Sequence, residues 1–158
     1  MDDNMDNEII DEITPKKPPV LIVDDDEVDR YVLKRLVKAS GLDLTIFEKI
    51  DGKEALDFFE NYEENKRKHP ESYPPILIFL DINMPRVNGI EFLEKFSHLR
   101  KIIEIDSCVI IMFSSSEREE DKKKIMAYDF VKDYVVKGTL TAEELKEKIL
   151  SVTLKHQQ

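Results

Sequence analysis

Five short apolar runs, spaced almost evenly along the chain, restrict most strongly what it can fold into. They are Val20 to Val23, Leu44 to Phe47, Ile76 to Leu80, Val109 to Phe113 and Tyr134 to Val136. Their first residues lie about 25 to 33 positions apart, which is roughly the length of one unit of strand, helix and strand. We therefore predict an α/β fold, a three-layer α/β/α sandwich built around a five-stranded parallel sheet.

Helical periodicity in the segments between these runs supports this prediction. The apolar residues expected to face inward are Val28, Tyr31, Val32 and Leu36 in the first helix, Ala55, Leu56 and Phe59 in the second, Phe92, Leu93 and Phe96 in the third, Ile125 and Met126 in the fourth, and Leu145, Ile149 and Val152 in the fifth. The second run, in LDLTIFEK, partly alternates polar with apolar residues, which is typical of an edge strand.

Helix ends are marked by polar residues and by glycine. Four helices open on a polar residue followed three positions later by Glu, the pattern of a capping box. These pairs are Asp51 and Glu54, Asn88 and Glu91, Ser116 and Glu119, and Thr141 and Glu144. Gly41 is placed to end the first helix. The long connection from Asn61 to Pro75 can extend the second helix in its first half, and the rest is expected to be loop.

Composition excludes several function classes. The polar, acidic segment Met1 to Pro19 predicts a flexible tail, which leaves residues 20–155 for the folded domain. A net charge of -10 disfavours direct binding to nucleic acid and to anionic lipid, because both are polyanions. No signal peptide and no apolar run of about 20 residues is present, and the single cysteine, Cys108, cannot form an internal disulfide. We expect a soluble, cytoplasmic protein.

Chemically useful side chains follow four of the five predicted strands. Asp24, Asp25 and Asp26 follow the first, Asp81 the third, Ser114 to Ser116 the fourth and Lys137 the fifth. Because the carboxyl ends of parallel strands lie along one edge of the sheet, we expect these residues to meet there. Each is unremarkable alone: an acidic triplet is usually a solvated turn or a helix cap, and a lysine at a strand end usually lies on the surface.

Together these residues predict a phosphoryl-transfer site. Clustered carboxylates repel one another unless a cation compensates, and a few oxygen ligands with room for water suit Mg²⁺. The metal, Lys137 and Ser114 could each neutralise or donate to an oxygen of a phosphoryl group. Asp81 would then be the nucleophile that accepts the group as an acyl phosphate.

The region from Val20 to about Leu154 resembles the receiver domain of bacterial two-component response regulators. The matching residues are the acidic pair Asp24 and Asp25, the phosphoacceptor Asp81 in LDINMPRVNG, the metal-binding backbone carbonyl of Asn83, the hydroxyl residue Ser114, the switch aromatic Tyr134 and the phosphate-pairing lysine Lys137. The resemblance implies strand order 2-1-3-4-5 and a Mg²⁺ site made by Asp24, Asp25, Asp81 and the Asn83 carbonyl.

The resemblance also implies a signalling role. Asp81 would receive a phosphoryl group from a sensor histidine kinase or phosphotransfer protein, and water would later remove it, with no other enzymatic activity. Output is expected through contacts of a downstream protein partner with the face formed by the fourth helix, fifth strand and fifth helix, or through phosphate relay to another protein. The same face is the candidate surface for a homodimer. Because the chain ends at Gln158, we expect a single-domain regulator without a DNA-binding output domain.

Two departures from the family pattern concern the last third of the chain. Gly138 stands where the family usually has proline after the lysine, and AYDFVKDY replaces the usual Gly-Ala pair before the fifth strand. The face made by the fourth helix and fifth strand should therefore be unusual. With the long loop that ends at Pro75, these features resemble single-domain regulators that partner bacterial phytochromes.

Two other readings of the same residues stay open. A haloacid-dehalogenase-type phosphatase would use Asp24 and Asp26 as its D-x-D pair, with Ser114 and Lys137 following, but it lacks an acidic pair after Lys137 and leaves Asp81 without a role. A receiver-like interaction module that is never phosphorylated would not need the complete set of acids, hydroxyl and lysine.

Overall fold

A computed structural model shows the predicted three-layer fold. The structure describes residues 17–103, 105–115 and 119–156, with side chains as far as residue 153. The strands are β1 (Pro19–Val23), β2 (Thr45–Lys49), β3 (Leu77–Leu80), β4 (Val109–Ser114) and β5 (Val131–Val136). They form one parallel sheet in the order β2-β1-β3-β4-β5. Strand order and the edge position of the second strand are thereby confirmed.

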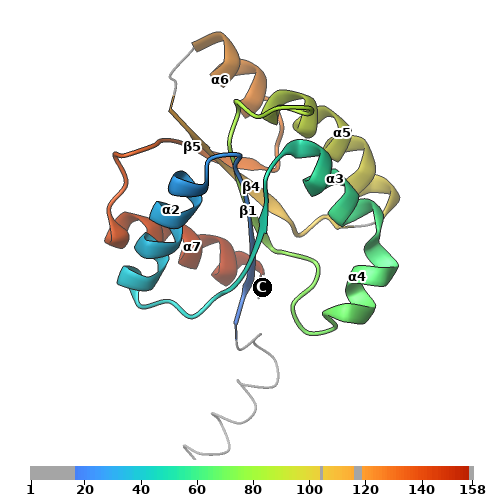
Figure 1. The fold of residues 1–158 in the computed structure, drawn as a ribbon, viewed down its shortest axis with the longest axis horizontal. Coiled ribbons are helices and arrows are strands. Elements are labelled where there is room, and N and C mark those ends of the chain that lie inside the picture. The colour runs from blue at the N-terminus through green and yellow to red at the C-terminus, as the bar shows by residue number, and fades with distance from the viewer. Residues whose placement is uncertain (1–16, 104, 116–118, 157–158) are drawn as a thin grey trace, which may run out of the picture.

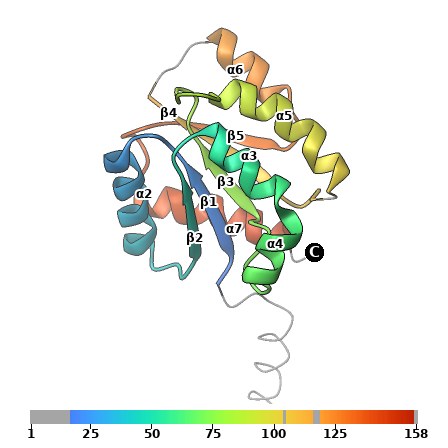
Figure 2. The same cartoon turned by 45° about the vertical axis from the view of Figure 1, so that its right-hand side comes forward.

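Helices cover both faces of the sheet, as Figures 1 and 2 show. They are α2 (Glu27–Ser40), α3 (Gly52–Glu60), α4 (Tyr62–Lys68), α5 (Gly89–Ile102), α6 (Glu119–Met126) and α7 (Ala142–His156). Alternate strand residues point to opposite faces, so Val20 and Ile22 pack beneath α2 and α7, whereas Leu21 and Val23 pack beneath α3 and α5. The sheet is therefore buried on both sides, which fits its nearly continuous apolar strands.

The chain between β2 and β3 differs from the expected extension of one helix. A separate helix, α4, follows α3, because Asn61 between them has a ψ of 44°, outside the helical range. The fifth strand also begins three residues earlier than predicted, at Val131 instead of Tyr134. Phe130 and Val131 are both buried, so the apolar part of the chain already begins there. Polar Lys132 and Asp133 obscure that start in the sequence.

Three of the four residues predicted for the inner face of the first helix are misplaced, whereas Leu36 is partly buried against the core as predicted. Val28, Tyr31 and Val32 are 65%, 55% and 46% exposed, and the buried residues of α2 are Leu33 and Val37. The first turn of α2 stands above the acidic end of the sheet, where Arg30 bonds the Asp24 carbonyl. Because polar contacts occupy the inward side of that turn, its apolar residues face outward. In α6, likewise, Ile125 is buried as predicted but Met126 is 41% exposed.

The helix caps agree with the sequence where the structure describes them. Asp51, Asn88 and Thr141 each accept a hydrogen bond from the backbone N–H three residues later. Gly41 ends α2 in the left-handed conformation, with a φ of 81°. Ser116 lies outside the described residues, as do the first 16 residues of the predicted tail. Cys108 is a buried free thiol, and no helix among the described residues combines the length and apolarity needed to cross a bilayer.

Phe96 should contribute strongly to stability, because it joins α5 to the aromatic core. Its ring centroid lies 5.0 Å from that of Phe59, 5.1 Å from that of Phe92 and 5.7 Å from that of Phe130. Phe96→Ala should lower the free energy of unfolding by about 3 to 5 kcal/mol. Urea denaturation measures this loss. The control is Ile102→Ala in the same helix, where the side chain is 77% exposed and the change should stay within about 0.5 kcal/mol. Equal losses in both variants would contradict this description of the core.

Candidate functional site

Three carboxylates meet at the carboxyl edge of the sheet. Val23 and Leu80 are paired in neighbouring strands, so the residues that follow them, Asp24 and Asp81, lie side by side. With Asp25 they each offer a carboxylate oxygen, and these oxygens lie within 4.8 Å of one another. Asp24 and Asp81 are each 4% exposed, whereas Asp25 is exposed. The cluster is therefore buried at Asp24 and Asp81 and open to solvent at Asp25.

Lys137 brings a positive charge to these acids. It follows β5 directly, and its backbone N–H donates a 2.8 Å hydrogen bond to the carbonyl of Ser114 at the end of β4. Its Nζ lies 2.7 Å from Asp24 Oδ2, 2.8 Å from Asp29 Oδ2 and 3.5 Å from Asp81 Oδ2. One ammonium thus serves three carboxylates. Asp29, in the first turn of α2, was not among the residues that the sequence singled out.

Burial and crowding of like charges determine the electrostatics of the cluster. Burial raises the pKa of Asp81 to about 6, and the neighbouring charge of Asp24 adds to the rise. Burial also raises the pKa of Asp24, although Lys137 partly opposes it. Burial alone would lower the pKa of Lys137, but its hydrogen bonds to Asp24 and Asp29 raise it above the usual range. The acids carry more negative charge than one lysine can compensate.

The donor set fits a hard divalent cation. Oδ1 of Asp81 is buried and has no hydrogen-bond partner, which is costly for a carboxylate oxygen unless a cation supplies the missing contact. The ligands brought together are carboxylate oxygens, the type that Mg²⁺ prefers, and the exposed side leaves room for water. Asp24, Asp25 and Asp81 would hold the ion. Asn83 lies two residues beyond Asp81 in the loop that borders the cluster.

That loop is fixed from both ends. A Cβ on Gly89 would lie 2.5 Å from the Asp81 carbonyl oxygen, so only glycine allows α5 to begin this close to the end of β3. At the other side, Arg86, with a φ of 63°, contacts the buried carboxylate of Asp51 through Nε at 2.8 Å and Nη2 at 2.7 Å. Burial alone would raise the pKa of Asp51, but the Glu54 N–H and Arg86 lower it below its usual range.

Sequence reasoning missed this link because it gave Asp51 one role. The Oδ1 atom caps α3, as predicted, and Oδ2 takes Arg86 from a loop 35 residues away. The backbone N–H of Gly52 also donates to the carbonyl of Val87 at 3.0 Å. No local pattern predicts such a contact, although the positive φ of a non-glycine residue is a structural sign that something holds it in place.

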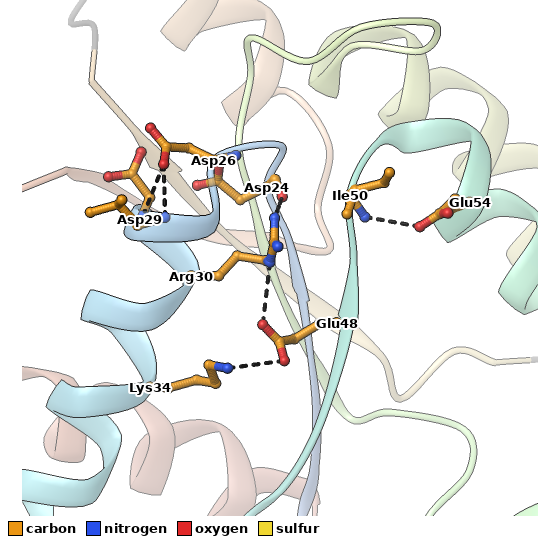
Figure 3. A network of polar contacts seen from close by, with 9 residues as sticks. Asp24, Asp26, Asp29, Arg30, Lys34, Glu48, Ile50 and Glu54 are labelled. Carbon is orange, nitrogen blue, oxygen red and sulfur yellow. Dashed lines mark hydrogen bonds and ion pairs between the residues drawn. The ribbon is translucent and has the colours of Figure 1, made fainter.

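A second set of contacts fixes the start of α2, as Figure 3 shows. Arg30 donates to the carbonyl oxygen of Asp24 at 2.7 Å and to Glu48 Oε1 at 3.2 Å. Lys34 reaches the other oxygen of Glu48 at 3.1 Å. The helix that carries Asp29 is thus tied to both β1 and β2. No sequence pattern predicts these contacts, because Glu48 has the spacing of an outward residue on an edge strand.

Ser114 and Tyr134 lie on the two strands nearest Lys137. Ser114 is fully buried at the end of β4. Tyr134 is half-buried in β5 opposite Met112, and the Nζ of Lys122 in α6 lies 5.8 Å from the centroid of its ring.

Gly138 adopts a φ of 87°, which proline cannot reach, so the turn after Lys137 differs from one that contains proline. Phe130, in the unusual segment before β5, packs into the core against Arg100 and Tyr128.

The geometry argues against the phosphatase reading. That reading needs Asp26 as a second catalytic acid. Asp26 is instead the cap of α2, because its Oδ1 accepts hydrogen bonds from the backbone N–H groups of Val28 at 2.8 Å and Asp29 at 3.4 Å. The buried acids beside Lys137 are Asp24 and Asp81. Asp81, which has no role in the phosphatase reading, therefore lies at the centre of the site.

Comparison with known proteins agrees with this geometry. A family model described as the response regulator receiver domain matches residues 20–150. The two-component response regulator ARR15 of Arabidopsis thaliana is 32% identical over 133 residues, which cover 83% of this chain and 62% of that protein. The hybrid signal transduction histidine kinase I of Dictyostelium discoideum is 34% identical over 128 residues, 80% of this chain and 7% of that protein. The chain thus spans less than two thirds of the length of these relatives.

Solved structures share the fold. A two-component response regulator from Cytophaga hutchinsonii has a TM-score of 0.71 and 28% identity, with 87% of this chain and 97% of that chain covered. The bacteriophytochrome response regulator RtBRR has a TM-score of 0.66 and 28% identity, with 86% of this chain and 78% of that chain covered.

The raised pKa of Asp81 predicts that this residue destabilises the metal-free protein above pH 6. The folded state binds its proton more tightly than the unfolded state does, since the pKa rises from 3.8 to about 6 on folding. Stability is therefore lost as the pH rises between these two values. Asp81→Asn removes this cost, and should raise the free energy of unfolding by roughly 1 to 3 kcal/mol at pH 8 with EDTA, less towards pH 4.

Denaturant titrations of both proteins across this pH range measure the effect. Losing the 3.5 Å contact with Lys137 offsets little of the gain, because Lys137 keeps Asp24 and Asp29. Added Mg²⁺ should shrink the difference by compensating the wild-type charge. A variant less stable than wild type at pH 8 in EDTA would show that Asp81 is not strained by its neighbours.

Proposed function

The chain belongs to the response regulator receiver domain family, and on that basis we propose that it is a phosphorylation switch in a two-component phosphorelay. Asp81 accepts a phosphoryl group from a sensor histidine kinase or a phosphotransfer protein in a Mg²⁺-dependent step. The observation that carries this proposal is the buried Asp81 carboxylate, with an unpartnered Oδ1, beside Asp24 and 3.5 Å from the Nζ of Lys137.

The transfer uses groups already placed around Asp81. A carboxylate oxygen of Asp81 attacks the phosphorus of a phosphohistidine, the bond from phosphorus to nitrogen breaks, and the imidazole leaves with the electron pair and takes up a proton. A Mg²⁺ ion held at this site would supply positive charge to the phosphoryl oxygens. The ligands proposed for it are Asp24, Asp25, Asp81 and the backbone carbonyl of Asn83. Lys137 and Ser114 contribute a positive charge and a hydroxyl to the same oxygens.

Loss of the phosphoryl group resets the switch. Attack of water on phosphorus cleaves the acyl phosphate, releases inorganic phosphate and restores the Asp81 carboxylate. Receiver domains are generally signalling modules instead of classical enzymes, so this self-dephosphorylation and the acceptance step are the only chemistry that we propose for the domain.

The switch is proposed to act through the face formed by α6, β5 and α7. A phosphoryl group adds charge and acceptor oxygens beside Ser114. Movement of Ser114 towards it would open space into which Tyr134, half-buried on β5, can turn. The resulting change in α6 and β5, which lie together in Figure 2, alters affinity for a downstream protein or a second copy of the chain.

The comparisons also support the kind of partner that we propose. The hybrid signal transduction histidine kinase and the bacteriophytochrome response regulator among the similar proteins bear names from two-component signalling. A cytoplasmic regulator that serves a phytochrome-type or related histidine kinase fits them. A partner protein fits the net charge of -10 better than nucleic acid or an anionic membrane does.

The alternative is a receiver fold that binds partners without being phosphorylated. Acetyl phosphate, a small phosphodonor, separates the two. Wild-type protein incubated with acetyl phosphate and Mg²⁺ should gain one phosphoryl group by intact mass, and should gain none in EDTA. Asp81→Asn should remain unmodified, because the amide cannot act as the nucleophile.

The matched control for this experiment is Asp26→Asn. It is the same substitution at an acid on the same edge of the sheet, and asparagine caps a helix about as well as aspartate. This variant should take up the phosphoryl group like wild type. An unmodified wild-type protein that also fails to bind beryllofluoride with Mg²⁺ would favour the unphosphorylated module.

Tyr134→Ala tests the proposed route to the partner face. The variant should accept the phosphoryl group at Asp81 normally, because Tyr134 lies outside the acid cluster. The change in partner affinity on phosphorylation should fall by about fivefold or more, the usual range of such coupling. Affinity for a captured partner, or for a second copy of the chain, measured with and without beryllofluoride gives the result. Unchanged coupling would remove Tyr134 from the switch.

A further inference from the structure

Lys137 has an acidic partner beyond the residues predicted from the receiver pattern. Its Nζ is 2.8 Å from Asp29 Oδ2, but 3.5 Å from Asp81 Oδ2. The ammonium that is needed at a phosphoryl group on Asp81 is therefore hydrogen-bonded elsewhere in the unphosphorylated protein. It is also 2.7 Å from Asp24.

The two competing carboxylates differ in what Mg²⁺ does to them. Asp24 belongs to the proposed ligand set, so a bound cation shares its charge and weakens its hold on Lys137. Asp29 lies outside the acid cluster that could hold a metal. It therefore keeps its attraction for the ammonium after the metal has bound, and remains the competitor when a phosphoryl group arrives.

Asp29 is held in place for this contact. It lies in the first turn of α2, and its backbone N–H donates to Asp26 Oδ1 at 3.4 Å. The next residue, Arg30, ties the same turn to β1 and β2, as Figure 3 shows. The Asp29 side chain is 35% exposed and the Lys137 side chain 13%. Because the backbone is held in place at both Asp29 and Lys137, forming the ion pair costs little additional conformational entropy.

We propose that Asp29 is a positioning residue that holds Lys137 away from Asp81 until a phosphoryl group is present. This inference rests on the proposed function. Phosphorylation draws Lys137 from Asp29 to the phosphoryl oxygens, so each captured phosphoryl group must displace the ion pair with α2. Asp29 thereby sets how tightly the site retains the group, and its release is a signal delivered to the start of α2.

Asp29→Asn tests this, because it removes the charge and keeps the size of the side chain. With Mg²⁺ saturating, we expect the variant to bind beryllofluoride about threefold to tenfold more tightly than wild type, the range for a partly exposed, charge-assisted pair. Bound beryllofluoride followed by ¹⁹F NMR during titration gives the affinity. Thermal denaturation of each protein shows that the fold is retained.

The matched control is Asp26→Asn, which removes a neighbouring charge that contacts backbone N–H groups of α2. A smaller gain in beryllofluoride affinity in this variant would show that the effect of Asp29→Asn comes from releasing Lys137. Removing any nearby negative charge, and with it some repulsion of the anionic ligand, would not explain the difference. The affinity for Mg²⁺ alone is measured in each variant first, so that every beryllofluoride titration is made with the metal site saturated.

Three outcomes overturn the inference. Wild-type affinity in Asp29→Asn would show that Asp29 does not compete for the lysine, and an equal gain in Asp26→Asn would show that only repulsion matters. If wild type itself fails to bind beryllofluoride with Mg²⁺, the proposed function fails and this inference fails with it.

Discussion

Repulsion among carboxylates held at one edge of a parallel sheet is the constraint on which the site depends. The pairing of β1 with β3 forces Asp24 and Asp81 together, and burial prevents water from screening them. Lys137 compensates only part of this charge. The unpartnered Oδ1 of Asp81 marks where compensation is missing, and a cation is the addition that would supply it. The same repulsion makes the site respond strongly when its charge changes.

Two lateral supports hold the edge in position. On one side, the buried carboxylate of Asp51 holds Arg86 and with it the loop that follows β3. On the other, Arg30 links the first turn of α2 to β1 and β2. Each support uses an ion pair with a carboxylate that lies outside the acid cluster. The backbone around Asp81 is therefore fixed by contacts that do not involve the side chains of the acid cluster.

The sequence predicted the layers and the meeting of the acids with Lys137, because these follow from apolar periodicity and from the geometry of parallel strands. The strand order was implied by the resemblance to receiver domains. Prediction failed where polar contacts override the apolar periodicity. The first turn of α2 faces the site through Asp29 and Arg30, so Val28, Tyr31 and Val32 point outward, against the prediction from spacing alone. The contact between Arg86 and Asp51 joins distant loops and leaves no local pattern. The polar residues at the start of β5 hid three residues of strand.

The most direct test of this account is a crystal structure of the protein with Mg²⁺ and beryllofluoride. We expect beryllium bound to a carboxylate oxygen of Asp81, Mg²⁺ held by Asp24 and Asp25, and the Nζ of Lys137 closer to the fluorides than to Asp29. Beryllofluoride bound at another residue, or a metal site that does not include these acids, would contradict it. If Lys137 still contacts Asp29 in the complex, the proposed phosphorylation of Asp81 stands, but the proposed competition of Asp29 for Lys137 is wrong.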